Sequence, residues 1–146
     1  MHSMKQFTAV ALRTILWVSL AGLLGCATTG TNPGIKVSLS GSQEVPPATT
    51  TASGSGTIVV GTDMSVSGSV TTVGVEATAA HIHIGAAGKN GPVIVPLAKT
   101  SDNVWSVPAG AKLTDAQYAS YKAGDLYVNV HSAKYKGGEI RGQLKP

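Results

Sequence analysis

The last twenty residues of the chain alternate between apolar and polar side chains, and this alternation constrains the fold more than any other feature. From Leu126 to His131, Leu and Val alternate with Tyr, Asn and His, and from Glu139 to Leu144 apolar residues or glycine again take every second position. A period of two is typical of a β-strand with one apolar and one polar face. The Lys- and Gly-rich segment between the two stretches predicts a turn, so we expect paired strands whose apolar face closes a core.

A second stretch repeats this pattern with histidines. In Ala80–Gly85, His81 and His83 fall on one face of the expected strand, whereas Ile82 and Ile84 fall on the other. Every histidine beyond the N-terminal leader lies in this stretch or in the C-terminal pair of strands.

The composition favours a single small all-β domain. Charged residues make up 12% and aromatic residues 5% of the chain, which carries 18 glycines and a formal charge of +4. Sparse charge with abundant Gly, Ser, Thr and Val is typical of short strands joined by many turns. The positive charges are scattered and form no cluster with interleaved aromatics, so we expect no nucleic-acid partner.

The N-terminal segment has the pattern of a lipoprotein signal peptide. A short basic region is followed by the apolar run 14–24, which is too short for a comfortable membrane span and typical of a signal-peptide core. The run ends in Leu23-Leu24-Gly25-Cys26, which resembles a bacterial lipobox, and we expect residues 1–25 to be the signal peptide. An ordinary signal peptide cut nearby, or an uncleaved anchor, is the alternative.

Cys26 is the only cysteine, which excludes a disulfide and a thiolate metal site within the chain. Lipidation of Cys26 would anchor the protein to the membrane, with residues 26–34 as a flexible tether. Ala27 follows the cysteine, and by resemblance to the enterobacterial sorting signal this favours the outer membrane, with the domain facing the periplasm or the cell surface. We therefore expect a cell-envelope protein.

Further short strands are expected upstream of the C-terminal pair, which at this spacing predicts two packed antiparallel sheets. The expected ranges are 35–40, 57–60, 64–73, 77–84, 93–97 and 104–107. Residues 49–55 are expected to form a loop, and residues 85–92 a hairpin loop without the spacing of a phosphate cradle.

One short helix is expected between two strands, at residues 115–122. Thr114 and Gln117 have the spacing of a capping box, and Gly124 is the expected stop.

Three separated motifs together resemble the CHRD domain, a module named from chordin and widespread in bacterial secreted proteins. They are Leu39–Pro47, Ala80–Gly85, and Val130–Ser132 with Gly138–Leu144, and we assign residues 35–146 to such a domain. The resemblance implies an all-β, immunoglobulin-like antiparallel sandwich or Greek-key barrel with one short connecting helix. It implies no established catalytic activity.

The histidines permit a metal site. Side chains at i and i+2 of a strand point the same way, so His81 and His83 can share one ion, and His131 from a neighbouring strand can complete a three-nitrogen site. Imidazole nitrogen suits copper and zinc. His81-Ile-His83 also resembles the copper-ligand strand of copper/zinc superoxide dismutase, but the other ligands and the cysteines of that family have no counterparts, so dismutation is not expected. The alternative is a structural polar face, with the imidazoles hydrogen-bonded to Ser132, Asn129 or Glu139.

Two other polar motifs leave alternatives open. Glu139 and Arg141 share one face and form either a ligand-binding pair or a surface ion pair worth at most about 1 kcal/mol. Gln43–Pro47 is either a recognition loop or a proline-stiffened edge that prevents aggregation.

From the sequence we expect a lipid-anchored, non-catalytic module that binds an envelope protein or glycan. The alternative is periplasmic copper or zinc binding through His81, His83 and His131. The first predicts an exposed apolar or aromatic patch, for example around Trp105, Tyr121 or Tyr135, and the second predicts that the three imidazoles converge.

Overall fold

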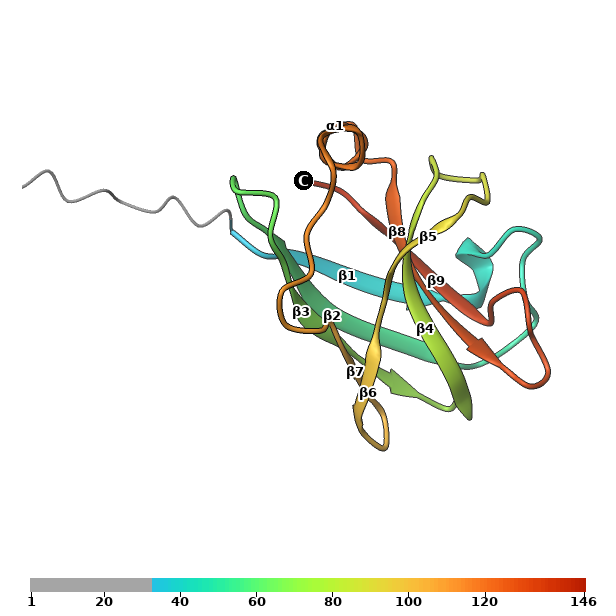
Figure 1. Ribbon diagram of the computed structural model, residues 1–146. Helices are drawn as coiled ribbons and strands as arrows, with labels where there is room; N and C mark the ends of the chain where they lie inside the picture. The colour runs from blue at the N-terminus through green and yellow to red at the C-terminus, as the bar shows by residue number, and fades with distance from the viewer. Residues whose placement is uncertain (1–32) are drawn as a thin grey trace, which may run out of the picture.

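The computed structural model describes residues 33–146 as a curled antiparallel β-sheet with one α-helix (Figure 1). The expected signal peptide, lipidated Cys26 and all but the last two residues of the tether lie outside the described residues. The elements are β1 (Ile35–Ser40), the 3-10 turn η1 (Gly41–Gln43), β2 (Ser53–Val60), β3 (Val66–Val73), β4 (Ala77–Ile84), β5 (Val93–Pro96), β6 (Ala98–Ser101), β7 (Val104–Ser106), α1 (Asp115–Lys122), β8 (Leu126–Ser132) and β9 (Ile140–Leu144).

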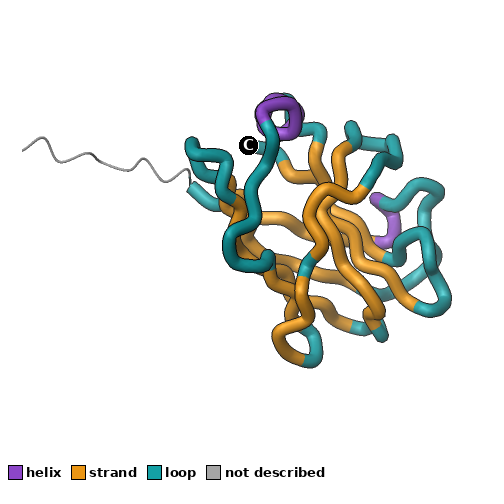
Figure 2. Tube along the Cα trace, in the orientation of Figure 1, coloured by secondary structure: helices purple, strands orange, loops and turns teal. Residues whose placement is uncertain are grey.

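The nine strands follow one another across the sheet in the order β5-β4-β8-β9-β1-β2-β3-β7-β6. The two edge strands, β5 and β6, are consecutive in the chain and are separated only by the buried residue Leu97. The sheet must therefore curl until its edges come together, which gives a nearly closed, barrel-like sandwich (Figure 2). The expected all-β antiparallel architecture with one short helix is confirmed.

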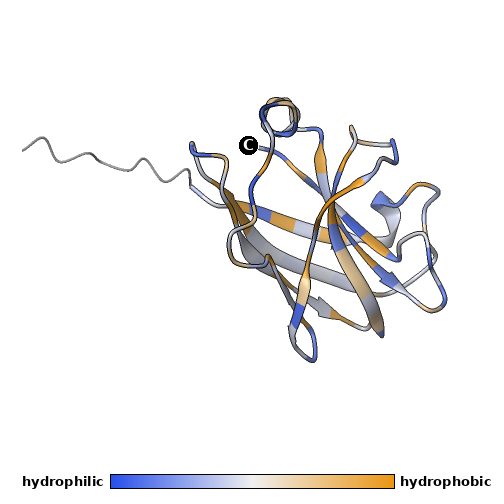
Figure 3. Cartoon of the chain, viewed as in Figure 1, coloured by the Kyte–Doolittle hydropathy of each residue, from blue (hydrophilic) through white to orange (hydrophobic). Residues whose placement is uncertain are grey.

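The core lies inside this curl. The inward positions of the C-terminal strands are fully buried, as their alternation predicts: Leu126, Val128 and Val130 of β8, and Ile140 and Leu144 of β9. Apolar residues of the other strands belong to the same core, and Figure 3 shows the hydropathy of each residue along the strands. At about 25 cal/mol per Å² of apolar surface removed from water, this burial is the main term that favours the fold.

The expected strand bounds hold within a few residues, except around β2 and β6. Residues 53–55, expected to be loop, begin β2 and pair with both β1 and β3. The sequence pattern did not predict this part of β2, because the glycines at positions 54 and 56 have low β-propensity. They are needed there: a Cβ on Gly56 would collide with the backbone of β3. The expected strand at residues 64–73 begins instead at Val66, since Met64 has a φ of +66° in the preceding turn.

Helix α1 has the expected bounds and its capping box is formed. The side chain of Thr114 accepts from the backbone N–H of Gln117, whose own side chain accepts from the backbone N–H of Thr114. Gly124, with a φ of +79°, ends the helical path as expected. No helix within residues 33–146 is long and apolar enough to cross a membrane.

Candidate metal centre

The outer face of β4, β8 and β9 carries the polar side chains that the sequence analysis singled out. Strand β8 is unusual because both of its faces are covered: Tyr127 and Asn129, on the outer side, are each only 2% exposed. In the register between β4 and β8, His81 lies opposite Asn129 and His83 lies opposite Tyr127. His131 lies two residues beyond Asn129 on the same face.

Three loops cover this face, and each loop contributes a direct hydrogen bond. Residues 41–48 contribute the carboxylate of Glu44, which accepts from Asn129. Residues 85–92 contribute the carbonyl of Gly91, and residues 133–139 contribute that of Lys136. The outer face is therefore a second, polar interior.

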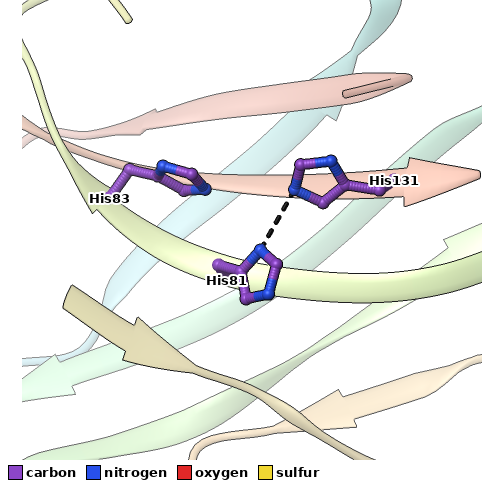
Figure 4. A group of neighbouring side chains, drawn as sticks. All are labelled: His81, His83 and His131. Carbon is purple, nitrogen blue, oxygen red and sulfur yellow. Dashed lines mark hydrogen bonds between the residues drawn. The ribbon is translucent and has the colours of Figure 1, made fainter. Parts of the chain in front are cut away.

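The three histidines converge, as the metal hypothesis requires (Figure 4). Nδ1 of His81 lies 3.0 Å from Nε2 of His131, and the ring centroids of these two residues are 4.9 Å apart. The ring centroid of His83 lies 5.6 Å from that of His81 and 6.1 Å from that of His131. One nitrogen from each of the three rings can be chosen so that all lie within 4.8 Å of one another.

Backbone carbonyls set the protonation of two of the rings. Nδ1 of His83 lies 2.9 Å from the carbonyl oxygen of Gly91, and Nδ1 of His131 lies 2.9 Å from that of Lys136. A carbonyl only accepts, so each Nδ1 carries the hydrogen and each neutral ring keeps a lone pair on Nε2. Metal-ligating histidines are commonly oriented by such a bond from the other ring nitrogen. Since Nε2 of His131 holds a lone pair, Nδ1 of His81 donates to it.

The surroundings favour the neutral, metal-binding form of two of the imidazoles. Burial lowers the pKa of His81 below its ordinary value, and the neighbouring His131 and His83 lower it further. Burial also lowers the pKa of His83, and this outweighs the hydrogen bond to Gly91, which raises it. Neutral imidazole is the form that ligates a metal.

The spacing is close to that of a bound ion but slightly open. With zinc–nitrogen bonds of about 2.1 Å, two nitrogens that share an ion lie at most about 4.2 Å apart. Nδ1 of His81 and Nε2 of His131 satisfy this limit once the ion displaces the hydrogen that His81 donates, whereas a spacing of 4.8 Å requires a small closing movement. Rotation of partly exposed His81 can supply it, since that ring is hydrogen-bonded to His131 and not to a loop carbonyl.

Tyr127 and Arg141 support His83 from one side. The ring of Tyr127 stacks on His83 with a centroid distance of 4.9 Å and an angle of 11° between the planes. The guanidinium of Arg141 lies 3.5 Å from the centroid of the Tyr127 ring. The hydroxyl of Tyr127 accepts from the backbone N–H of Gly91, so the same loop holds both His83 and the ring beneath it. His83 is thus fixed before any ligand arrives.

Glu44, Asn129 and Gly138 form a second support, which sequence reasoning missed. Nδ2 of Asn129 donates to Oε1 of Glu44 over 3.0 Å, and a Cβ on Gly138 would collide with the Asn129 amide. Burial raises the pKa of the Glu44 carboxyl, while the bond from Asn129 and the charge of Arg141 oppose this rise. The signal available in the sequence was a charged residue within the Gln43–Pro47 motif. Glu44 belongs to the covered face, whereas Gln43, Pro46 and Pro47 are exposed, and both interpretations of the motif stay predictions.

The interpretation of Glu139 and Arg141 as a surface ion pair is wrong. They are 7% and 1% exposed and bind different partners. Glu139 accepts from the hydroxyl of Thr50 over 2.7 Å, whereas Arg141 donates to the side chains of Asn90 and Gln143 and to the carbonyl of Ala86. Alternation places these side chains on a polar face, but only the loops that cover the face decide that they are buried.

The expected exposed aromatic patch is not formed by Trp105 or Tyr121. These residues are 5% and 4% exposed and belong to the core. Tyr135 is half-buried, and its hydroxyl donates to the carbonyl of Thr49 over 2.6 Å. Of the two observations that separate the function hypotheses, the converging imidazoles are present, whereas two of the three expected patch residues are buried.

Comparison with known proteins identifies the family. Residues 35–144 match the family model of the CHRD domain. Searches of curated proteins and of solved structures gave no match. The match spans most of the chain and includes the histidine strand, the Glu44 motif and the C-terminal strand pair, and the chain therefore belongs to the CHRD domain family.

Proposed function

We propose that this protein binds a copper or zinc ion through His81, His83 and His131. The observation that carries the proposal is the convergence of three imidazole nitrogens within 4.8 Å. Two of the rings are held by loop carbonyls on Nδ1, so each presents an Nε2 lone pair: that of His83 has no partner, and that of His131 accepts from His81. A structural polar face needs hydrogen bonds between the strands, but it does not need three imidazoles that face one another.

The ligand chemistry favours copper(II) over zinc. Both ions accept three imidazoles, and divalent copper binds a given nitrogen site more tightly than zinc does. Three nitrogen ligands with an open position also suit either ion. We expect a binding module without catalytic activity, in which the bound ion is the cargo.

We also propose that the domain is attached to the bacterial envelope through lipidated Cys26, with residues 1–25 removed. The support is the lipobox-like sequence that precedes the only cysteine. An outer-membrane protein facing the periplasm or the cell surface would meet copper and zinc there. Incorporation of labelled palmitate into the wild-type protein, but not into a Cys26→Ser variant, is the expected result, and equal labelling of both would contradict it.

Calorimetric titration tests the metal site directly. The full-length chain with Cys26→Ser, which removes the only thiol, is titrated with Cu(II) and separately with Zn(II). One ion per chain is expected, with copper bound more tightly. His83→Ala is expected to lower both affinities by at least about 100-fold, because the ring is a fixed ligand and not only a support for one.

The matched control is Thr57→Ala, which truncates an exposed side chain on the outer face of β2 and should leave both affinities unchanged. Wild-type affinity in His83→Ala, or no heat above dilution in the parent chain, would contradict the proposal.

A further inference from the structure

Asn129 is the common neighbour of the three histidines. It lies directly opposite His81 in the strand register and two residues from His131 on its own strand. It lies diagonally across from His83 in the same register. A side chain at this position faces the place where the three rings converge.

The amide oxygen of Asn129 is left without a partner. Within residues 33–146, three buried side-chain polar atoms have no hydrogen-bond partner: Nε2 of His83, Nε1 of Trp105 and Oδ1 of Asn129. Two of the three lie in this site. Buried polar atoms are rarely left unpaired, since each one costs about 1–3 kcal/mol.

The orientation of the amide is fixed by its other end. Nδ2 of Asn129 donates to Oε1 of Glu44 over 3.0 Å and to the carbonyl of Gly137 over 3.4 Å. Both partners only accept, so the nitrogen must face them and the oxygen is turned away from them. Nε2 of His83 and Oδ1 of Asn129 both offer lone pairs, and neither can satisfy the other without a hydrogen or a cation between them.

We propose that Oδ1 of Asn129 is the fourth ligand of the metal, which gives a set of three nitrogens and one oxygen. This inference rests on the proposed function. A bound cation would satisfy both orphaned acceptors at once. An amide oxygen is a hard ligand, and the set contains no thiolate or thioether, so the site selects Cu(II) and Zn(II) over Cu(I). Glu44 acts through Asn129 as a positioning residue.

Exchanging the amide of Asn129 with the carboxylate of Glu44 tests the role of Oδ1 of Asn129 as a ligand. The exchange keeps the hydrogen bond between the two side chains. In Glu44→Gln, the new amide oxygen still accepts from Asn129, so Zn(II) affinity should stay close to that of the parent chain. In Asn129→Asp/Glu44→Gln, the amide of residue 44 donates to the new carboxylate, which presents a charged oxygen to the ion. We expect this double variant to bind Zn(II) more tightly than Glu44→Gln, and equal or weaker binding would overturn the proposal.

Asn129→Ala removes the oxygen and is expected to lower Zn(II) affinity by at least about 10-fold. The water-proton relaxivity of the Cu(II)-loaded variant should also rise, because water takes the vacated position, whereas a merely supporting Asn129 would leave relaxivity unchanged. Unchanged affinity and relaxivity would remove Asn129 from the ligand set and leave the three-histidine site intact. A parent chain that binds no metal would instead refute the site itself. If Asn129→Ala fails to fold, the comparison of Glu44→Gln with Asn129→Asp/Glu44→Gln still tests whether residue 129 ligates the ion.

Discussion

The outer faces of two parts of the same sheet differ in their relation to water. On β2 and β3, the outward residues Ser55, Thr57, Ser67 and Thr71 are exposed. On β8 and β9, the outward residues Tyr127, Asn129 and Arg141 are buried beneath three loops. Both faces read as polar in the sequence, so polarity alone does not distinguish a solvated surface from a polar interior.

The difference lies in what the side chains require. Short hydroxyl side chains are satisfied by water and need no cover. A buried amide, guanidinium or imidazole must find its partners within the protein. The covered face meets this need with loop carbonyls and with Glu44, but it leaves Nε2 of His83 and Oδ1 of Asn129 unpaired. Orphaned acceptors within an otherwise satisfied network are the mark of a ligand site.

The largest stability difference between the two faces is expected at Arg141. Arg141→Ala removes donors from the side chain of Asn90 and the carbonyl of Ala86, and it uncovers the Tyr127 ring. We expect a loss of about 3 kcal/mol in the free energy of unfolding. Thr57→Ala, on the solvated face, should stay within about 0.5 kcal/mol of wild type. Urea unfolding of both variants measures these changes in the free energy of unfolding. Similar losses in Arg141→Ala and Thr57→Ala would contradict the distinction between the covered and the solvated face.

A smaller loss in the free energy of unfolding is expected at Gly138, where the loop of residues 133–139 meets the covered face. Gly138 has a φ of +137°, and a Cβ there would collide with Nδ2 of Asn129 and crowd Glu44. Gly138→Ala should cost about 2 kcal/mol. The neighbouring Gly137 is a matched control, because a Cβ there meets no atom within 4 Å. Thermal unfolding should show a lower Tm for Gly138→Ala alone, and equal Tm values would show that the two positions are equally tolerant.

The smallest effect is a pH dependence that belongs to Glu44. Its pKa in the folded protein is raised above the ordinary 4.5, so the folded state holds the proton more tightly than the unfolded chain does. Its contribution to stability is therefore fully present below pH 4.5 and is lost as the pH rises through the raised pKa. The neutral amide in Glu44→Gln does not titrate and has no such dependence. The stability of Glu44→Gln relative to wild type should rise as the pH is raised from 4.5 through the raised pKa of Glu44. A constant difference in denaturant midpoint would argue against a costly buried charge.

The sequence was sufficient for the parts of the fold that depend on local pattern. Alternation predicted β4, β8 and β9 and the inward faces of the last two, and the spacing of Thr114 and Gln117 predicted the start of α1. These signals are local, since each depends on neighbours within a few residues.

The covered face could be predicted only in part. His81, His83 and His131 were identified as a possible cluster, because two share one strand and the third lies in a strand expected to neighbour it. Glu44 was missed because its partner Asn129 lies 85 residues further along the chain. The burial of Arg141 depends in turn on a loop more than fifty residues away. No local pattern encodes the path of a loop across a sheet.

The covered face presents two metal ligands, His83 and His131, that loop carbonyls hold in place before the ion arrives. Long-range ¹H–¹⁵N correlation spectra of the imidazoles, recorded on the full-length Cys26→Ser chain before and after one equivalent of Zn(II), test it most directly. We expect His83 and His131 to be neutral with hydrogen on Nδ1 at the start, and we expect zinc to shift their Nε2 resonances while Nδ1 stays protonated. Rings protonated on Nε2 at the start, or Nε2 resonances unmoved by zinc, would contradict it.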